Sequence, residues 1–323
     1  MCSNSYYEIR QLLLRFENTQ EEIAAVTQCE PMGARAIVPC FDEPEYKAIW
    51  NVTIIHPVGT KAIANALELS ETTEPNGKWK VSRFHPTPIL ASYLLALFVS
   101  EYEYEESFTK RGVRFRVWST PITKEERAYG LKGATTYMEF FEEYFGVEDT
   151  VKKQDLVALP DFSAGAMENW GLITFREGAL LQRGLPKPGE ISQQLTIIAH
   201  ELAHQWFGNM VTLKDWGELW LNEGFATFFE NTWFHTKTEG ELYRTVYATL
   251  DFDTALEEDS FATSRPLCSI IDTPSEIFET FDGISYKKGG AILEMTANLM
   301  GAQKFRKGLS RIIGASGAKP YLS

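Results

Sequence analysis

The sequence is poor in cysteine and histidine and contains no long apolar run. Its 323 residues include 4 cysteines and 5 histidines. No two cysteines form a CxxC pair, so they indicate neither a thiolate metal site nor a dense disulfide framework, and the redox compartment stays open. No apolar run approaches the roughly 20 residues that cross a bilayer. The first residues also lack the basic and apolar regions of a signal peptide.

Positive charge is scarce as well. The 31 Lys and Arg residues are outnumbered by 44 Asp and Glu residues, which gives a formal net charge of −13. A protein that binds nucleic acid needs a basic face to neutralise phosphates, so we expect no nucleic-acid partner. The acidic balance suits cationic partners, among them the free α-amine of a peptide. The hydrophobic fraction of 44% is typical of a soluble globular protein.

The sequence pattern changes near residue 100. Residues 26–105 contain short β-type runs separated by turn-forming residues, which predicts antiparallel sheet structure. After about residue 110 the apolar residues recur with the helical period. The expected strands lie in the runs 50–55, 61–64, 79–81 and 93–99, and the expected helices cover residues 125–145, 191–205, 221–235 and 289–299.

These patterns predict an α+β fold, because strands and helices occupy different parts of the chain. We expect an antiparallel β domain over residues 1–100 and a mainly helical domain over residues 101–323. Sheet-type sequence begins soon after the N-terminus, and the last ten residues trail off after a helical stretch. We therefore expect the chain to be part of a longer protein.

Residues 200–204 read HELAH. Positions four apart on a helix lie on one face about one turn apart, so His200 and His204 can bind the same metal ion. Glu201 beside them is placed to accept a proton from a metal-bound water. The alternative is a pair of hydrogen-bonded histidines on a helix surface. With 5 histidines in the whole chain, their occurrence in this frame favours the metal site.

A third ligand is expected on the next helix, because a catalytic zinc takes three protein ligands and keeps one position open. Glu223 stands in an apolar and aromatic segment after His204. Burying a carboxylate there is costly unless it is paired or bound to a metal, so Glu223 is the predicted third ligand. Glu218 on the same segment either orients a ligand histidine or is a solvated charge on the helix surface.

Residues 161–171 form a segment rich in small residues, and a single carboxylate, Glu168, follows the small residues. Small residues permit close approach of two backbones, as when an extended substrate lies along an edge strand. The residue chemistry alone leaves it open whether this segment is a functional element or a loop without a role in catalysis.

Taken together, these segments resemble the M1 family of zinc aminopeptidases, the gluzincins. The resemblance is carried by GAMEN at residues 165–169, HELAH at 200–204 and Glu223, and by family-like segments at 27–30, 39–44, 203–212 and 281–289. It covers about residues 26–310. It implies a partial N-terminal β domain followed by a thermolysin-like catalytic domain that is truncated at its C-terminal end.

The resemblance also implies roles for individual residues. His200, His204 and Glu223 match the ligands of one Zn²⁺ ion, Glu201 matches the general base, and Tyr286 matches the tyrosine that stabilises the oxyanion. Glu168 matches the glutamate that binds the α-ammonium group of the substrate, and Gln28 matches a residue beside the first-residue pocket. The implied substrate-binding residues are Gln28, Gly165, Ala166, Met167, Glu168 and Asn169.

We therefore expect a zinc-dependent aminopeptidase that removes the N-terminal residue of peptides through a zinc-activated water. Gln28, which is not acidic, favours neutral or basic first residues. A membrane anchor, if the parent protein has one, would lie upstream of this chain, and a plasma-membrane ectoenzyme is favoured over a cytoplasmic enzyme.

Four alternatives compete with the prediction of a zinc aminopeptidase. A thermolysin-like endopeptidase is disfavoured by the segment around Glu168. A relative of the epoxide-hydrolase type would carry glycine and proline where this chain has Ala166 and Trp170. A non-catalytic peptide-binding or receptor-type relative should have lost a metal ligand or the base. The last alternative is a fragment that is inactive alone.

Overall fold

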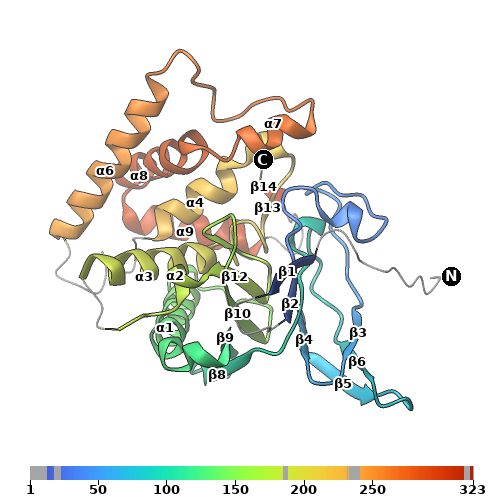
Figure 1. The fold of residues 1–323 in the computed structure, drawn as a ribbon. Coiled ribbons are helices and arrows are strands. Elements are labelled where there is room, and N and C mark those ends of the chain that lie inside the picture. Colours follow the sequence, from blue (N-terminus) through green and yellow to red (C-terminus); the bar gives the residue numbers. More distant parts are fainter. Residues whose placement is uncertain are drawn as a thin grey trace.

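The computed structural model describes residues 13–17, 23–184, 188–230, 232, 241–315 and 321–322. In Figure 1 the N-terminal strands, coloured blue and cyan, lie to the right of a mixed sheet, and the later helices lie above it and to its left. Antiparallel sheets are thus followed along the chain by a mainly helical part. The predicted fold class is confirmed.

The N-terminal part contains two antiparallel sheets. The first has the strand order β1-β2-β7-β4, with bounds Leu13–Glu17, Ile23–Thr27, Leu97–Ser100 and Lys61–Ala64. The second has the order β3-β6-β5, with bounds Thr53–Pro57, Trp79–Phe84 and Glu68–Thr73. The predicted run 61–64 coincides with β4. The predicted run 93–99 begins instead with the short helical turn Ser92–Leu94, and only its end is strand.

A five-stranded mixed sheet follows, in the order β11-β12-β10-β9-β8. Its strands are Ala166–Met167, Leu172–Arg176, Lys153–Leu159, Arg114–Ser119 and Glu103–Phe108. The sequence patterns did not predict this sheet. Every residue of β10 is buried, so the strand lacks the alternation of apolar and polar residues by which strands are recognised. The predicted division at residue 100 falls between β7 and β8, which belong to different sheets, and it stays a prediction.

The helices pack on this sheet and on one another. Their bounds are α1 Arg127–Phe145, α2 Glu177–Leu180, α3 Pro188–Ala203, α4 Trp220–Glu230, α6 Glu241–Asp259, α7 Pro274–Glu279, α8 Gly289–Met300 and α9 Ala302–Gly314. The four predicted helices correspond to α1, α3, α4 and α8. Prediction placed the end of the third at residue 235, but α4 ends at Glu230, and residues 231 and 233–235 lie outside the described ranges.

Aromatic side chains fix α4 against α1 and the end of α3. The rings of Phe145 and Phe229 lie 4.9 Å apart, and those of Phe207 and Phe225 lie 4.3 Å apart. All four residues are buried. Each buried phenylalanine contributes about 1.5–3 kcal/mol of hydrophobic stabilisation, so this cluster holds the two elements that carry the predicted metal ligands.

Two glycines bring α8 close to α4. A Cβ atom added to Gly224 would lie 3.0 Å from the Cα atom of Gly289, which is tighter than nine in ten such contacts. Glycine accommodates this approach of two helix backbones without a shift. Because Gly224 follows Glu223 and Gly289 follows the segment of Tyr286, the contact places these two predicted site residues beside each other.

A buried ionic network joins the mixed sheet to the N-terminal part. Asp155 on β10 is fully buried and accepts hydrogen bonds from Arg116 Nε (2.6 Å), Trp118 Nε1 (2.8 Å) and Lys153 Nζ (2.7 Å). Arg116 Nη2 also contacts Glu68 Oε1 on β5 at 2.6 Å. Burial alone would raise the pKa of Asp155, but Lys153 and Arg116 hold it well below its usual range.

We expect Asp155→Asn to lower the free energy of unfolding by about 3–5 kcal/mol, because it leaves the buried Lys153 ammonium without a carboxylate and Arg116 with Glu68 alone. Since the pKa of Asp155 is depressed in the folded state, its contribution is present above the unfolded pKa and is lost as the pH falls through the folded value. Urea denaturation measures the change. Glu139→Gln, which removes an exposed ion pair to Lys110, is the control and should shift the midpoint little. Equal shifts for both variants would contradict the prediction.

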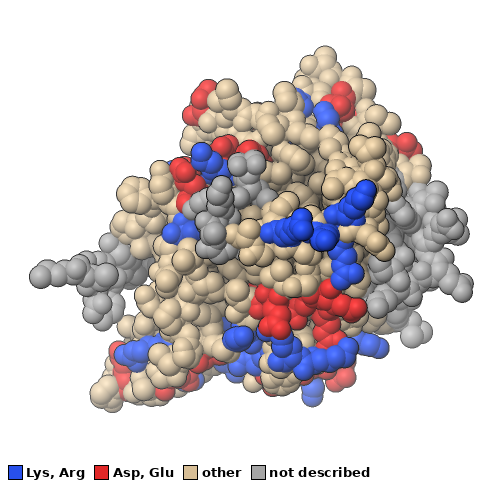
Figure 2. Space-filling view, turned by 180° about the vertical axis from the view of Figure 1, so that it is seen from behind, with Lys and Arg blue, Asp and Glu red and all other residues tan. Residues whose placement is uncertain are grey.

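The surface carries mixed charge. Figure 2 shows acidic and basic side chains in neighbouring groups on the face seen from behind. Surface ion pairs such as Lys110–Glu139 (2.8 Å) and Lys288–Asp259 (2.7 Å) join the two signs. Within the ranges that the structure describes, no helix combines the length and the apolar character needed to cross a membrane.

Candidate metal centre and substrate cavity

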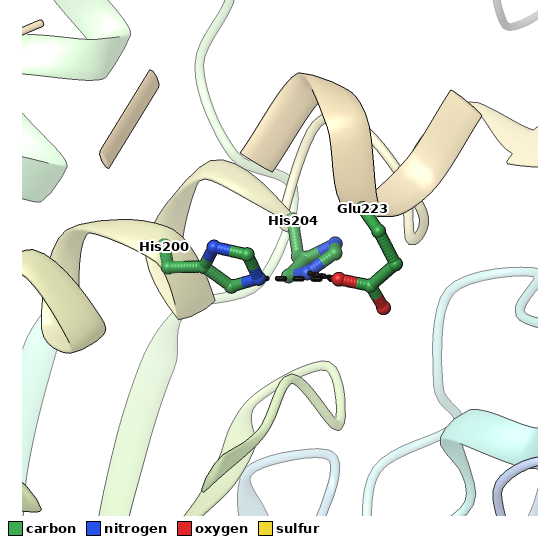
Figure 3. A group of neighbouring side chains, drawn as sticks. All are labelled: His200, His204 and Glu223. Atoms are coloured by element: carbon green, nitrogen blue, oxygen red, sulfur yellow. Dashed lines mark hydrogen bonds and ion pairs between the residues drawn. The ribbon is translucent and has the colours of Figure 1, made fainter. Parts of the chain in front are cut away.

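The two predicted histidine ligands and the predicted glutamate ligand meet in the structure. Helix α3 carries His200, and His204 follows one residue after its end while its backbone N–H still donates to the His200 carbonyl at 3.2 Å. The two imidazoles are therefore one helical turn apart, as predicted. Glu223 reaches them from α4, and Figure 3 shows the rings and the carboxylate pointing at one another. One ligand atom from each residue lies within 4.8 Å of the other two.

The spacing of these atoms fits a tetrahedral ion. The distance from Glu223 Oε2 is 3.2 Å to His200 Nε2 and 3.4 Å to His204 Nε2. Two ligand atoms that each lie about 2.05 Å from a tetrahedral ion are about 3.3 Å apart. A mixed set of imidazole nitrogen and carboxylate oxygen also suits zinc. The residues present thus fit a zinc ion in both chemistry and spacing.

The second nitrogen of each imidazole has a partner that fixes the ring. His200 Nδ1 lies 2.9 Å from Glu230 Oε2, and His204 Nδ1 lies 2.9 Å from the carbonyl oxygen of Phe207. Such contacts orient a ligand ring and select the nitrogen that faces the metal. The sequence offered Glu218 as a residue that orients a ligand histidine, but Glu218 lies on the wall of a different cavity. Glu230 makes that contact with His200 instead.

Burial and neighbouring charge shift the pKa values of Glu201, of both histidines and of Glu223. Burial raises the pKa of Glu201 to about 8. Burial alone would lower the pKa of His200, but hydrogen bonds to Glu223 and Glu230 raise it to about 9. Burial would raise the pKa of Glu223, but the charge of His204 and the hydrogen bonds from both histidines lower it to about 2. A metal ion would compete with protons for these same atoms.

The cluster lies in the wall of a cavity of about 590 Å³. Every predicted site residue except one lines this cavity: Gln28, Gly165, Ala166, Met167, Glu168, His200, Glu201, His204, Glu223 and Tyr286. The exception is Asn169, which is fully buried and is not part of the lining. Asn169 follows the end of β11 by two residues, where the chain leaves the cavity wall.

Glu201 and Tyr286 flank the histidines. The side chain of Glu201 is 6% exposed, and its Oε2 atom has no hydrogen-bond partner among the described residues. Tyr286 lies in the short π-helix Ile284–Lys288, with its ring nearly parallel to that of His200 and the centroids 6.0 Å apart. Burial and the surrounding carboxylates raise the pKa of Tyr286 well above its usual range, so its hydroxyl remains a hydrogen-bond donor.

A second group of carboxylates adjoins the first. Glu30, Glu168 and Glu223 each place an oxygen within 4.8 Å of the others. Burial and the charge of Glu168 raise the pKa of Glu30 well above its usual range. Glu30 was not predicted as a site residue. The available indication was its place in the family-like segment 27–30, since β2 ends at Thr27 and strand spacing does not extend to Glu30.

Segment 166–167 forms strand β11 at the edge of the mixed sheet, next to the cavity. Among the described residues its backbone pairs with β12 alone. Arg176 holds the preceding loop, since its Nε donates to the carbonyl of Phe162 at 3.0 Å and its Nη2 donates to that of Ser163 at 2.8 Å. The cavity thus has an extended backbone edge beside its carboxylates.

Two family models match the chain. The model of the Peptidase family M1 domain matches residues 129–319, which is more than half of the chain. The model of the Peptidase M1 N-terminal domain matches residues 12–94. Peptidases of this family are zinc-dependent in general.

Curated relatives agree with these matches. The chain is 47% identical to an aminopeptidase N of Haemonchus contortus over 315 residues, which cover 97% of this chain and 32% of the relative. It is 40% identical to the aminopeptidase N of Homo sapiens over 304 residues, with coverages of 91% and 31%. It is 38% identical to a glutamyl aminopeptidase of Bitis rhinoceros over 298 residues, with coverages of 92% and 31%. The chain spans about a third of the length of these relatives, and it belongs to peptidase family M1.

Proposed function

We propose that this chain carries the active site of a zinc aminopeptidase. The observation that supports this proposal best is that one cavity holds two clusters of ligand side chains with different chemistry, and that both clusters include Glu223. One is the pair of imidazoles with a carboxylate, and the other is a set of three carboxylates. The first suits zinc, whereas the second suits a cation bound through oxygen, such as the α-ammonium group of a peptide.

In this proposal His200, His204 and Glu223 hold one Zn²⁺ ion. When bound, zinc supplies a Lewis acid that polarises a carbonyl group and acidifies water. Glu230 and the Phe207 carbonyl keep the two rings turned towards that position, through the contacts at 2.9 Å described above.

Glu201 is the proposed general base. Its carboxylate is buried beside the histidines, where it can take a proton from the attacking water and deliver it to the leaving amine. Tyr286 is the proposed donor to the developing oxyanion, because its hydroxyl stays protonated in this cavity. Preorganised donors of this kind contribute about 10²–10³-fold to the rate.

Glu30, Glu168 and the free oxygen of Glu223 would bind the α-ammonium group. Gly165 and Ala166, the residue before β11 and its first residue, lie on the cavity wall. The edge of β11 that has no partner among the described residues can pair with the extended substrate backbone. A bound amine leaves no room for residues upstream of the first one, which restricts cleavage to the first peptide bond. Gln28 and Met167 line the space beside it, and their neutral side chains favour neutral or basic first residues over acidic ones.

The test is hydrolysis of alanyl and leucyl fluorogenic amides by the purified chain, beside the N-acetylated forms and a chelator-treated sample. Hydrogen bonds to a charged group contribute about 1.5–3 kcal/mol, so acetylation should lower kcat/KM at least about 10–100-fold. Chelation should abolish cleavage, and added zinc should restore it. Equal cleavage of free and acetylated substrates would refute the aminopeptidase proposal, while zinc-independent cleavage would refute the role of the metal.

A further inference from the structure

The backbone that carries Glu168 is held by two buried amide side chains. Asn209 Nδ2 donates to the carbonyl oxygen of Glu168 at 2.9 Å, and Gln205 Nε2 reaches the same oxygen at 3.5 Å. Gln205 Nε2 also donates to the carbonyl oxygen of Glu201 at 2.8 Å. Both amides are fully buried. They therefore connect the backbone of the proposed amine-binding glutamate to the backbone of the proposed base.

These contacts continue into a closed circuit. Gln154 Nε2 donates to Gln205 Oε1 at 3.1 Å and to Asp149 Oδ2 at 2.9 Å, and Trp170 Nε1 donates to Asp149 Oδ1 at 2.9 Å. Because Trp170 is two residues after Glu168, the circuit begins and ends on the same short segment. The side chains of this polar ring are Asp149, Gln154, Trp170, Gln205 and Asn209.

The carboxylate of Glu168 has little else to fix it. Its Oε1 atom has no hydrogen-bond partner among the described residues, and it lies 3.8 Å from His204 Nδ1. The position of this carboxylate is thus set through its backbone. An exopeptidase needs a fixed separation between the group that binds the amine and the base that serves the first peptide bond. An error of about 1 Å in such a separation can cost about 10²-fold in rate.

We infer that Gln205 and Asn209 are positioning residues that set the separation between Glu168 and Glu201, and so the one-residue register of cleavage. This inference rests on the proposed function. It assigns to the polar ring a role beyond satisfying buried polar groups, because its amides contact the backbones of two different site residues.

Asn209→Asp tests this role, because it keeps the side-chain shape but replaces the N–H donor with an oxygen that repels the Glu168 carbonyl. We expect kcat/KM for the leucyl amide to fall about 10–100-fold, mainly through a higher KM, with bound zinc unchanged. Cleavage of the N-acetylated amide should change little, so the discrimination between free and blocked substrates should fall. Gln205→Glu is the second variant and should act in the same direction.

Asn65→Asp is the matched control. Asn65 is also a buried amide, and its Nδ2 donates to the carbonyl of Trp170 at 2.9 Å, two residues after Glu168. It should lose comparable thermal stability and keep the full discrimination. If Asn209→Asp also keeps it, or if Asn65→Asp loses it equally, the positioning role is refuted. A parent chain that binds zinc but does not discriminate would instead refute the proposed function, and this inference with it.

Discussion

Glu201→Gln is expected to lower kcat by about 10²–10⁴-fold, the range that a positioned general base contributes. Glutamine matches glutamate in shape but cannot accept the proton. The buried side chain of Glu201 lies beside the histidines without being one of the three converging ligand groups, so the variant should keep its zinc. Steady-state kinetics on the leucyl amide and zinc analysis of the same sample measure the two quantities.

KM of the Glu201→Gln variant provides a second test. KM for the free-amine substrate should change little, because the carboxylates proposed to bind the amine remain in place. A kcat within about threefold of that of the parent chain, with zinc bound, would exclude Glu201 as the base. Loss of zinc in parallel with activity would instead make Glu201 part of the metal site.

Glu223→Gln is expected to weaken zinc binding by more than about 100-fold, which exceeds the usual effect of residues that only orient a ligand. Glu223 Oε2 is the atom on which both imidazoles converge, and an amide oxygen carries no charge to offset that of the ion. Competition with a chromophoric chelator gives the dissociation constant directly and does not depend on activity.

Variants of two other glutamates provide comparisons for the zinc affinity of Glu223→Gln. Glu230→Gln should weaken zinc binding about 10–100-fold, because Glu230 orients His200 without contacting the proposed ion position. Glu218→Gln lies on the wall of the other cavity and should leave the affinity unchanged. If Glu223→Gln binds zinc as tightly as Glu218→Gln does, Glu223 is not a ligand.

The convergence of His200, His204 and Glu223 was predictable because it depends on local geometry and simple chemistry. Helical spacing places the two histidines on one face, and the cost of burying a lone carboxylate singles out Glu223. Glu230 and Glu30 were not predictable in this way. Their roles depend on which distant segments of the chain meet, and the spacing of residues along the chain contains no such information.

For the fold as well, only elements with a clear local pattern were predictable from the sequence. Strand β4 has the local pattern of a strand and was predicted with its observed bounds. Strand β10 begins with Lys153, Gln154 and Asp155, which suggests an exposed segment. Each of the three nevertheless has a buried partner outside the strand, in Ala64, Asp149 and Arg116 respectively. Tyr286 was identifiable only through the family resemblance, since an isolated aromatic residue in a helical stretch resembles a core residue.

Glu223 is shared by the two clusters of candidate ligands, and this sharing has a thermodynamic consequence. Its carboxylate belongs both to the group that suits zinc and to the group that suits an ammonium ion. Two ligands that draw on one side chain are energetically coupled, and such coupling is reciprocal. If zinc changes the affinity for a free amino acid by some factor, the amino acid must change the affinity for zinc by that same factor. Under the proposed function, metal retention by this protein should therefore depend on the concentration of the amino acid that it releases.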